Sequence, residues 1–83
     1  MPLYMDVHTI AGGVTMDSVI QAHKADLQNQ AGHDVSYLRY WVDENRGKLF
    51  CLVEAPSAVA ASAVHREAHG LVAQEIFQVQ EGT

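Results

Sequence analysis

An alternation of apolar and polar side chains over residues 3–9 opens the chain and predicts a β-strand with two different faces. Two further runs, residues 35–42 and 48–54, are rich in β-branched and aromatic side chains, which also favour strands. The polar residues 43–47 between them predict that these two strands form a hairpin. A short run at residues 74–80, with apolar side chains at three positions, predicts a last strand.

The two segments that separate the first strand from the hairpin, and the hairpin from the last strand, are predicted to be helices. In the first segment apolar residues recur three or four positions apart, with Thr15 or Asp17 as the N-cap and Gly32 as the stop signal. The stripe expected to face the core consists of Met16, Val19, Ile20, His23 and Leu27. The second segment is alanine-rich, which favours a helix between the N-cap Ser57 and the stop signal Gly70.

The resulting order, strand–helix–strand–strand–helix–strand, defines the fold class. Two right-handed crossover units of this kind interleave into a four-stranded antiparallel sheet with both helices on one face. This is the α+β ferredoxin-like arrangement. A chain of 83 residues, 48% of them hydrophobic, is expected to form one such domain over residues 1–83.

The hairpin register predicts which side chains lie beneath the helices. Pairing Asp43 with Lys48 places Leu38 opposite Val53 and puts Cys51 on the helix-covered face. The open face would then carry Tyr4, Asp6, His8, Tyr37, Arg39, Trp41, Phe50, Leu52 and Glu54. An aromatic patch of this size exceeds what a monomer normally exposes. We therefore expect a second copy to cover it, sheet against sheet, in a homodimeric α/β barrel.

Charge and composition exclude several kinds of partner. Five basic residues against ten acidic ones give a formal net charge of −5, and without a basic patch nucleic acid is not an expected partner. The N-terminus lacks a signal-peptide pattern and no stretch approaches the roughly 20 apolar residues of a membrane span. No membrane partner is therefore expected. The single cysteine, Cys51, excludes an internal disulfide and suits a cytoplasmic protein.

His65 and His69 are the sequence feature that points most strongly to chemistry. At four positions apart on a helix their Cβ atoms lie roughly 5–6 Å apart on one face, so both imidazoles can reach one metal ion. The segment reads H-R-E-A-H, and its Glu67 lies about 200° around the helix from His65. This excludes the H-E-x-x-H arrangement of metalloproteases. The alternative is a pair of partly exposed helix histidines with little role in the core.

Three segments, MPLYMDVH, YLRYWVDENRGKLFCLVEAP and AVHREAHGLVAQEI, resemble a family of short bacterial proteins catalogued as a domain of unknown function. The resemblance extends from Pro2 to about Val79. Members of that family have the dimeric ferredoxin-like α/β-barrel fold and include proteins described as nickel-binding and nickel-responsive. The resemblance therefore implies a bound metal, nickel in the first place, and a homodimer, but no established reaction.

Asp6, His8 and Cys51 are the remaining candidate ligands. Alternation places Asp6 and His8 on the same face of the first strand, and an imidazole with a carboxylate suits nickel or zinc. The alternative is an ion pair between Asp6 and Arg39, with a hydrogen-bonded histidine at the dimer interface. Cys51 is either a further ligand or a small buried hydrophobe. His23, within an apolar stripe, is expected to be a core histidine.

These patterns predict a protein that binds a divalent transition metal for sequestration or sensing. Nickel is the first expectation, with zinc or copper as alternatives. The candidate ligands are His65, His69, His8, Asp6 and Cys51. The chain offers no catalytic signature such as a glycine-rich phosphate loop or C-x-x-C. The alternative is a small dimeric enzyme, similar to the cofactor-free oxygenases and isomerases that share this barrel, acting on a small aromatic molecule between the sheets. Its chamber would contain Asp6, His8, Arg39 and Glu54.

Overall fold

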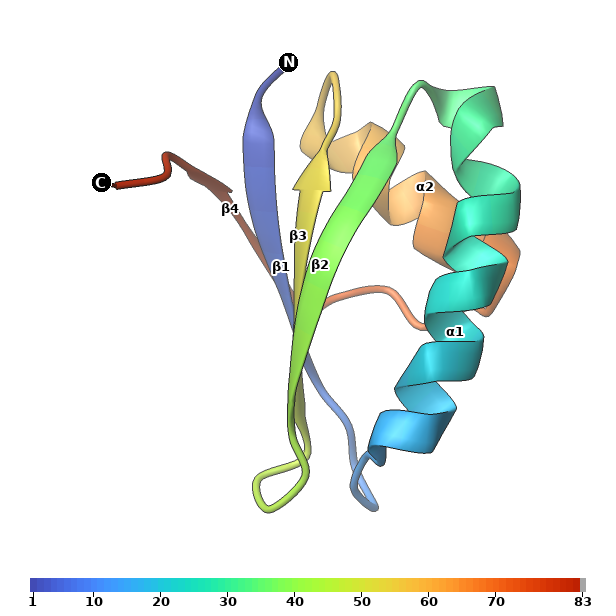
Figure 1. Ribbon diagram of the computed structural model, residues 1–83, viewed down its shortest axis with the longest axis vertical. Helices are drawn as coiled ribbons and strands as arrows, with labels where there is room; N and C mark the ends of the chain where they lie inside the picture. The colour runs from blue at the N-terminus through green and yellow to red at the C-terminus, as the bar shows by residue number, and fades with distance from the viewer. Residues whose placement is uncertain (83) are drawn as a thin grey trace.

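The computed structural model describes residues 1–82 and has the predicted order of elements (Figure 1). These elements are β1 (Leu3–Thr9), α1 (Met16–Asn29), a 3-10 turn (Gln30–His33), β2 (Ser36–Asp43), β3 (Lys48–Glu54), α2 (Ala58–Ala68) and β4 (Glu75–Val79). The bounds predicted for β1 and β3 are the observed ones. Neither described helix is long and apolar enough to cross a membrane.

The strands form one antiparallel sheet in the order β2-β3-β1-β4. Figure 1 shows α1 and α2 together on one face of this sheet, which confirms the predicted ferredoxin-like fold. The core lies between the helices and the sheet. Its buried residues are Val14, Val19, Val35, Tyr37, Leu49, Cys51, Val53, Ala55, Ala61 and Val64.

Side-chain and backbone hydrogen bonds explain where the helices begin and end. Thr15 caps α1 through a capping box, in which the side chains of Thr15 and Ser18 each accept the other's backbone N–H. Ser57 caps α2 by accepting a backbone N–H in its first turn. At the other end Gly70, with φ 81°, donates its N–H to the carbonyl oxygen of His65. These hydrogen bonds set where both helices begin and where α2 ends.

α1 presents a different face to the core from the one predicted by its apolar stripe. Leu27 and Met16 are 45% and 42% exposed, whereas Asp26 is only 3% exposed. The buried residues of the helix, Val19 and Asp26, are seven positions apart and so lie on one row. The predicted stripe was therefore wrong at its ends. A carboxylate takes the interior place expected for Leu27, and a buried carboxylate needs partners.

A β-bulge corrects the predicted register of the hairpin at one point. The pairs Asp43–Lys48 and Tyr40–Cys51 are confirmed, but the register shifts between Tyr37 and Arg39. Tyr37, not Leu38, therefore lies opposite Val53. As a result Tyr37 is buried beneath the helices at 5% exposure, while Leu38 is 44% exposed.

β1 also faces the opposite way from the prediction. It pairs with β3 so that Asp6 lies opposite Cys51 and His8 lies opposite Leu49. Side chains directly opposite each other in antiparallel strands point to the same face, and Cys51 and Leu49 belong to the core. Asp6 and His8 consequently lie beneath the helices, with exposures of 1% and 2%.

The open face of the sheet carries a groove of about 430 Å³. Its lining residues are Leu3, Met5, Leu38, Arg39, Trp41, Leu52, Val79, Gln80 and Glu81. The prediction that Trp41 and Arg39 belong to this face is correct. The predicted chamber of Asp6 and His8 with Arg39 and Glu54 is wrong, because Asp6 and His8 lie on the other side of the sheet.

Candidate metal centre

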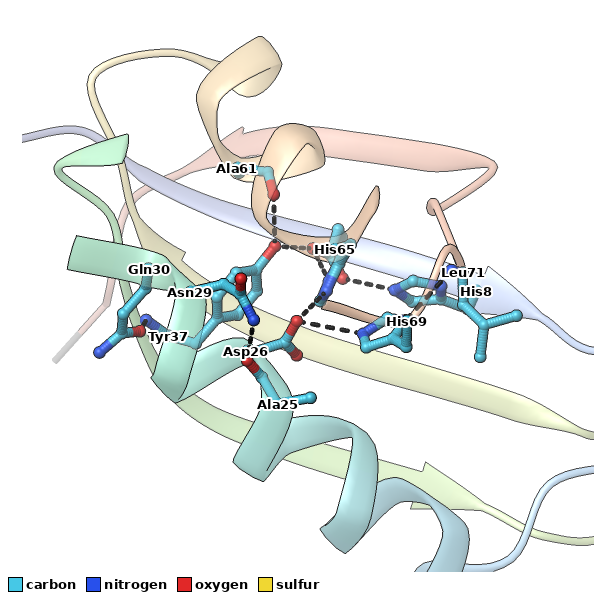
Figure 2. A network of polar contacts seen from close by, with 11 residues as sticks. His8, Ala25, Asp26, Asn29, Gln30, Tyr37, Ala61, His65, His69 and Leu71 are labelled. Atoms are coloured by element: carbon cyan, nitrogen blue, oxygen red, sulfur yellow. Dashed lines mark hydrogen bonds and ion pairs between the residues drawn. The ribbon is translucent and has the colours of Figure 1, made fainter. Parts of the chain in front are cut away.

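His65 lies at the centre of a buried polar cluster between the two helices and the sheet (Figure 2). It stands in the last turns of α2 and is 2% exposed. Its Nδ1 is 2.8 Å from Oδ1 of Asp26 on α1, and its Nε2 is 3.0 Å from Oδ2 of Asp6 on β1. The alternative of a partly exposed helix histidine therefore does not apply to His65, which joins three elements of the fold.

Both ring nitrogens of His65 face carboxylate oxygens, so both hydrogen bonds form only if both nitrogens carry protons. Burial alone would lower the pKa of His65, but the hydrogen bonds to Asp26 and Asp6 and their negative charges outweigh burial and raise the pKa to about 9. In the metal-free protein His65 is thus an imidazolium held between two carboxylates.

Asp6 accepts hydrogen bonds from several directions. His8 Nε2 lies 3.1 Å from its Oδ1, and the hydroxyl of Tyr37 lies 3.0 Å from its Oδ2. Tyr37 also lies 3.1 Å from the carbonyl oxygen of Ala61, so its single proton is shared between two acceptors. Burial would raise the pKa of Asp6, but the hydrogen bonds from His65 and His8 and their charges hold it well below its usual range.

His69 makes a second contact with Asp26. Its Nε2 is 3.1 Å from the same Oδ1 that faces His65, and its Nδ1 accepts the backbone N–H of Leu71 at 3.1 Å. The Leu71 contact fixes the tautomer of His69 with the proton on Nε2. Burial would raise the pKa of Asp26, but hydrogen bonds from His65 and His69 and the positive charge of His65 lower it.

Cys51 projects from β3 into the same cluster and is 5% exposed. Burial and the negative charge of Asp6 raise the pKa of its thiol, so the sulfur is protonated in the metal-free protein. A coordinated divalent ion removes such a proton outright, because the ion stabilises the thiolate far more than its surroundings do. The predicted placement of Cys51 on the helix-covered face is confirmed.

The potential ligands fall into two groups that share His65. The inner group consists of Asp6, His8, Cys51 and His65, all buried. The outer group consists of Asp26, His65 and His69. Within each group one donor atom per residue lies within 4.8 Å of the others. Two donors bonded to one ion at about 2.0–2.3 Å are at most about 4.6 Å apart, so little movement would bring either group onto an ion.

The structure thus gathers all five predicted ligands and adds two residues that the sequence analysis missed. Asp26 was missed because the stripe predicted for α1 ran through Leu27 and contained no carboxylate, although the position of Asp26 seven residues after Val19 marks it as inward-facing. Tyr37 was assigned to the wrong face because nothing in the sequence revealed the bulge. His23 is half-buried against Tyr40, with ring centroids 4.7 Å apart, outside both ligand groups.

A cavity of about 70 Å³ adjoins the cluster. Asp26, Cys51, His65 and His69 contribute to its otherwise largely apolar wall. An internal cavity that accepts benzene is about 150 Å³. The cavity is therefore too small to hold an aromatic molecule of that size.

The chain is similar to proteins named for their response to nickel. The family model described as "Nickel responsive protein SCO4226-like" matches residues 4–79. The crystal structure of SCO4226 from Streptomyces coelicolor A3(2) superposes with a TM-score of 0.89 at 40% sequence identity, over 98% of this chain and 99% of that chain. No curated protein matches the chain. The predicted family resemblance is confirmed by these matches.

Proposed function

The chain belongs to the family of SCO4226-like nickel-responsive proteins, and from this premise we propose that it binds nickel through the inner group. One observation carries the proposal: a carboxylate, two imidazoles and a thiol from three different elements converge in the interior. Such polar groups are costly to bury and are seldom brought together without a purpose.

The donor set suits the ion. Imidazole and thiolate are the ligands that select borderline transition metals such as nickel and zinc over magnesium or calcium. The carboxylate of Asp6 is already ionised, and it adds negative charge where the ion would be held. Tyr37 stays protonated, because burial and the charge of Asp6 raise its pKa, and its hydroxyl holds the carboxylate in position.

The binding step serves sequestration and sensing alike. In either use the residues of the inner group would lose protons when they bind the ion. The bound ion would then lie in the interior of the protein, away from solvent. Copper binds most nitrogen and sulfur sites more tightly than nickel does. Preference for nickel in the cell would therefore depend on metal supply as well as on these ligands, and the proposal of nickel is supported chiefly by the family.

Equilibrium dialysis of untagged, reduced protein against nickel tests the proposal. We expect Cys51→Ser and His8→Gln each to lower the affinity at least tenfold, the lower end of what changes around a metal site cost. His33→Gln is the matched control, because His33 is a histidine in an exposed pair with Glu67. Parent-like affinity in both inner-group variants would refute the inner group as the binding site.

A further inference from the structure

The two ring nitrogens of His65 face two different sets of donors. Nδ1 points toward Asp26, which also contacts His69 (Figure 2). Nε2 points toward the inner group at Asp6. Building on the proposed function, we propose that the cluster holds two divalent ions at once, with the imidazole of His65 as a bridge between them. The second ion would occupy the outer group.

Ring geometry separates the two groups. The lone pairs of Nδ1 and Nε2 lie in the ring plane and diverge, so one ion can bond to only one of these nitrogens. An ion bound at Nε2 is therefore bound by the inner group and leaves Nδ1 aimed at Asp26, 2.8 Å away. The carboxylate of Asp26 and the ring of His69 then remain available as donors to a second ion.

Charge balance favours two ions over one. Fully deprotonated, the donors carry four negative charges, one each on Asp6, Asp26, the Cys51 thiolate and the His65 imidazolate. Two divalent ions carry four positive charges and leave the buried cluster neutral. A single ion, with one proton retained on His65, leaves one negative charge uncompensated in the interior, where unpaired charge is costly. When both ions are bound, both ring protons of His65 and the thiol proton of Cys51 have passed to solvent.

The cavity gives the outer ion room for further ligands. It is lined by Asp26, His65 and His69 and has a volume of about 70 Å³. A water molecule needs roughly 10–15 Å³ of such space together with polar partners, so water can complete the shell of an ion that has only three protein donors. His69, with its side chain 15% exposed, places the outer group nearer to solvent than the inner group.

Loading of the outer group also has a structural consequence. To bind an ion through Nε2, His69 must move its proton to Nδ1, which now accepts the N–H of Leu71. The Leu71 N–H must then turn toward water, and this is feasible because Leu71 is 48% exposed. The segment between α2 and β4 would thus rearrange when the second ion binds.

Metal stoichiometry of untagged, reduced protein tests the proposal with nickel alone. The parent should bind two ions per chain, His69→Gln and His8→Gln one each, and the control His33→Gln two. One ion per chain in the parent would overturn the bridge and leave the proposed function standing. Failure of the parent to bind any nickel would overturn both.

Cobalt(II) in place of nickel tests the bridge itself. Electron spins on two ions joined through one imidazolate couple to each other, so the electron paramagnetic resonance signal per cobalt should be weaker in the fully loaded parent than in singly loaded His69→Gln. An equal signal per ion in the two proteins would show that two occupied sites are not bridged, and would overturn the proposal even if the stoichiometry is two. Both proteins in this comparison keep His65, so no variant at His65 is needed.

Discussion

The imidazole of His65 and the carboxylate of Asp26, 39 residues apart in sequence, meet at 2.8 Å and join α2 to α1 inside the protein. The same imidazole reaches Asp6 on β1 at 3.0 Å. One side chain therefore ties both helices to the sheet. His65 has a structural role in the metal-free protein in addition to its proposed role as a ligand.

Removal of His65 should destabilise the metal-free protein strongly. His65→Ala would leave the carboxylates of Asp6 and Asp26 buried without their shared cation, and loss of one partner of a buried ion pair costs roughly 3–5 kcal/mol. Urea unfolding of metal-free protein measures this loss. His33→Ala, which breaks the exposed 2.8 Å pair with Glu67, should cost less than about 1 kcal/mol. Similar losses in the two variants would contradict the structural role of His65.

The stability of the metal-free protein should decrease as the pH rises above neutrality. Folding raises the pKa of His65 from 6.5 to about 9, so its contribution is complete below the unfolded value and disappears as the pH rises through the folded one. Folding lowers the pKa values of Asp6 and Asp26 from 3.8, so their contributions are lost only in acid.

Maximal stability is therefore expected between these limits, from about pH 4 to about pH 6.5. The free energy of unfolding, measured in urea at about pH 5.5 and at about pH 9.5, compares the range of maximal stability with the range in which stability decreases. Asp26→Asn is an informative variant, because it removes a group that raises the pKa of His65, and its stability should fall less between the two conditions. A parent equally stable at both values would argue against a buried imidazolium.

Nickel affinity should continue to rise with pH well beyond the range expected from ordinary histidines. A metal that binds His65 must displace a proton held with a pKa of about 9, and one that binds Cys51 must displace a thiol proton whose pKa is also raised, so proton competition extends to at least about pH 9. Sequence reasoning alone would place the loss of binding only below about pH 6, where ordinary imidazoles become protonated. Competition with a chelator of known affinity measures the profile. A plateau reached by about pH 7 would mean that neither His65 nor Cys51 is a ligand.

The open face of the sheet is expected to pair with a second copy of the chain. Trp41 is 49% exposed beside the groove of about 430 Å³, and its neighbours there are mostly apolar. Trp41→Glu would bury a charge in that interface and should give monomers in sedimentation experiments. Leu27→Glu is the control, because Leu27 is 45% exposed on α1, outside the groove, and should not change the association state. A parent that sediments as a monomer at micromolar concentration would contradict the expected dimer.

The fold could be predicted well from the sequence, because its strands, helix caps and hairpin turn depend on residues that are close together in the chain. Alternation identified β1, and the caps Thr15 and Ser57 are the observed ones. The hairpin register near its turn followed from Asp43 and Lys48, which the structure pairs as expected.

The candidate site was predicted only in part, because it depends on pairings between distant segments. His65 and His69 were identified by spacing, but the burial of His65 depends on contacts with Asp26 and Asp6, 39 and 59 residues away in sequence. The alternation of apolar and polar side chains in β1 predicts a strand with two different faces, but it does not determine which face lies against the helices. That choice is made by the pairing of Asp6 with Cys51, which no local pattern specifies.

Anomalous X-ray scattering at the nickel edge, from crystals of the untagged protein grown with nickel, tests the central claim most directly. We predict a strong anomalous peak within bonding distance of His8, Cys51 and the Nε2 atom of His65. Cys51→Ser crystals should show that peak weakened or absent, with any peak elsewhere unchanged. Anomalous density confined to surface groups such as His33 and Glu67, with the inner group still holding the hydrogen bonds of the metal-free protein, would contradict the account.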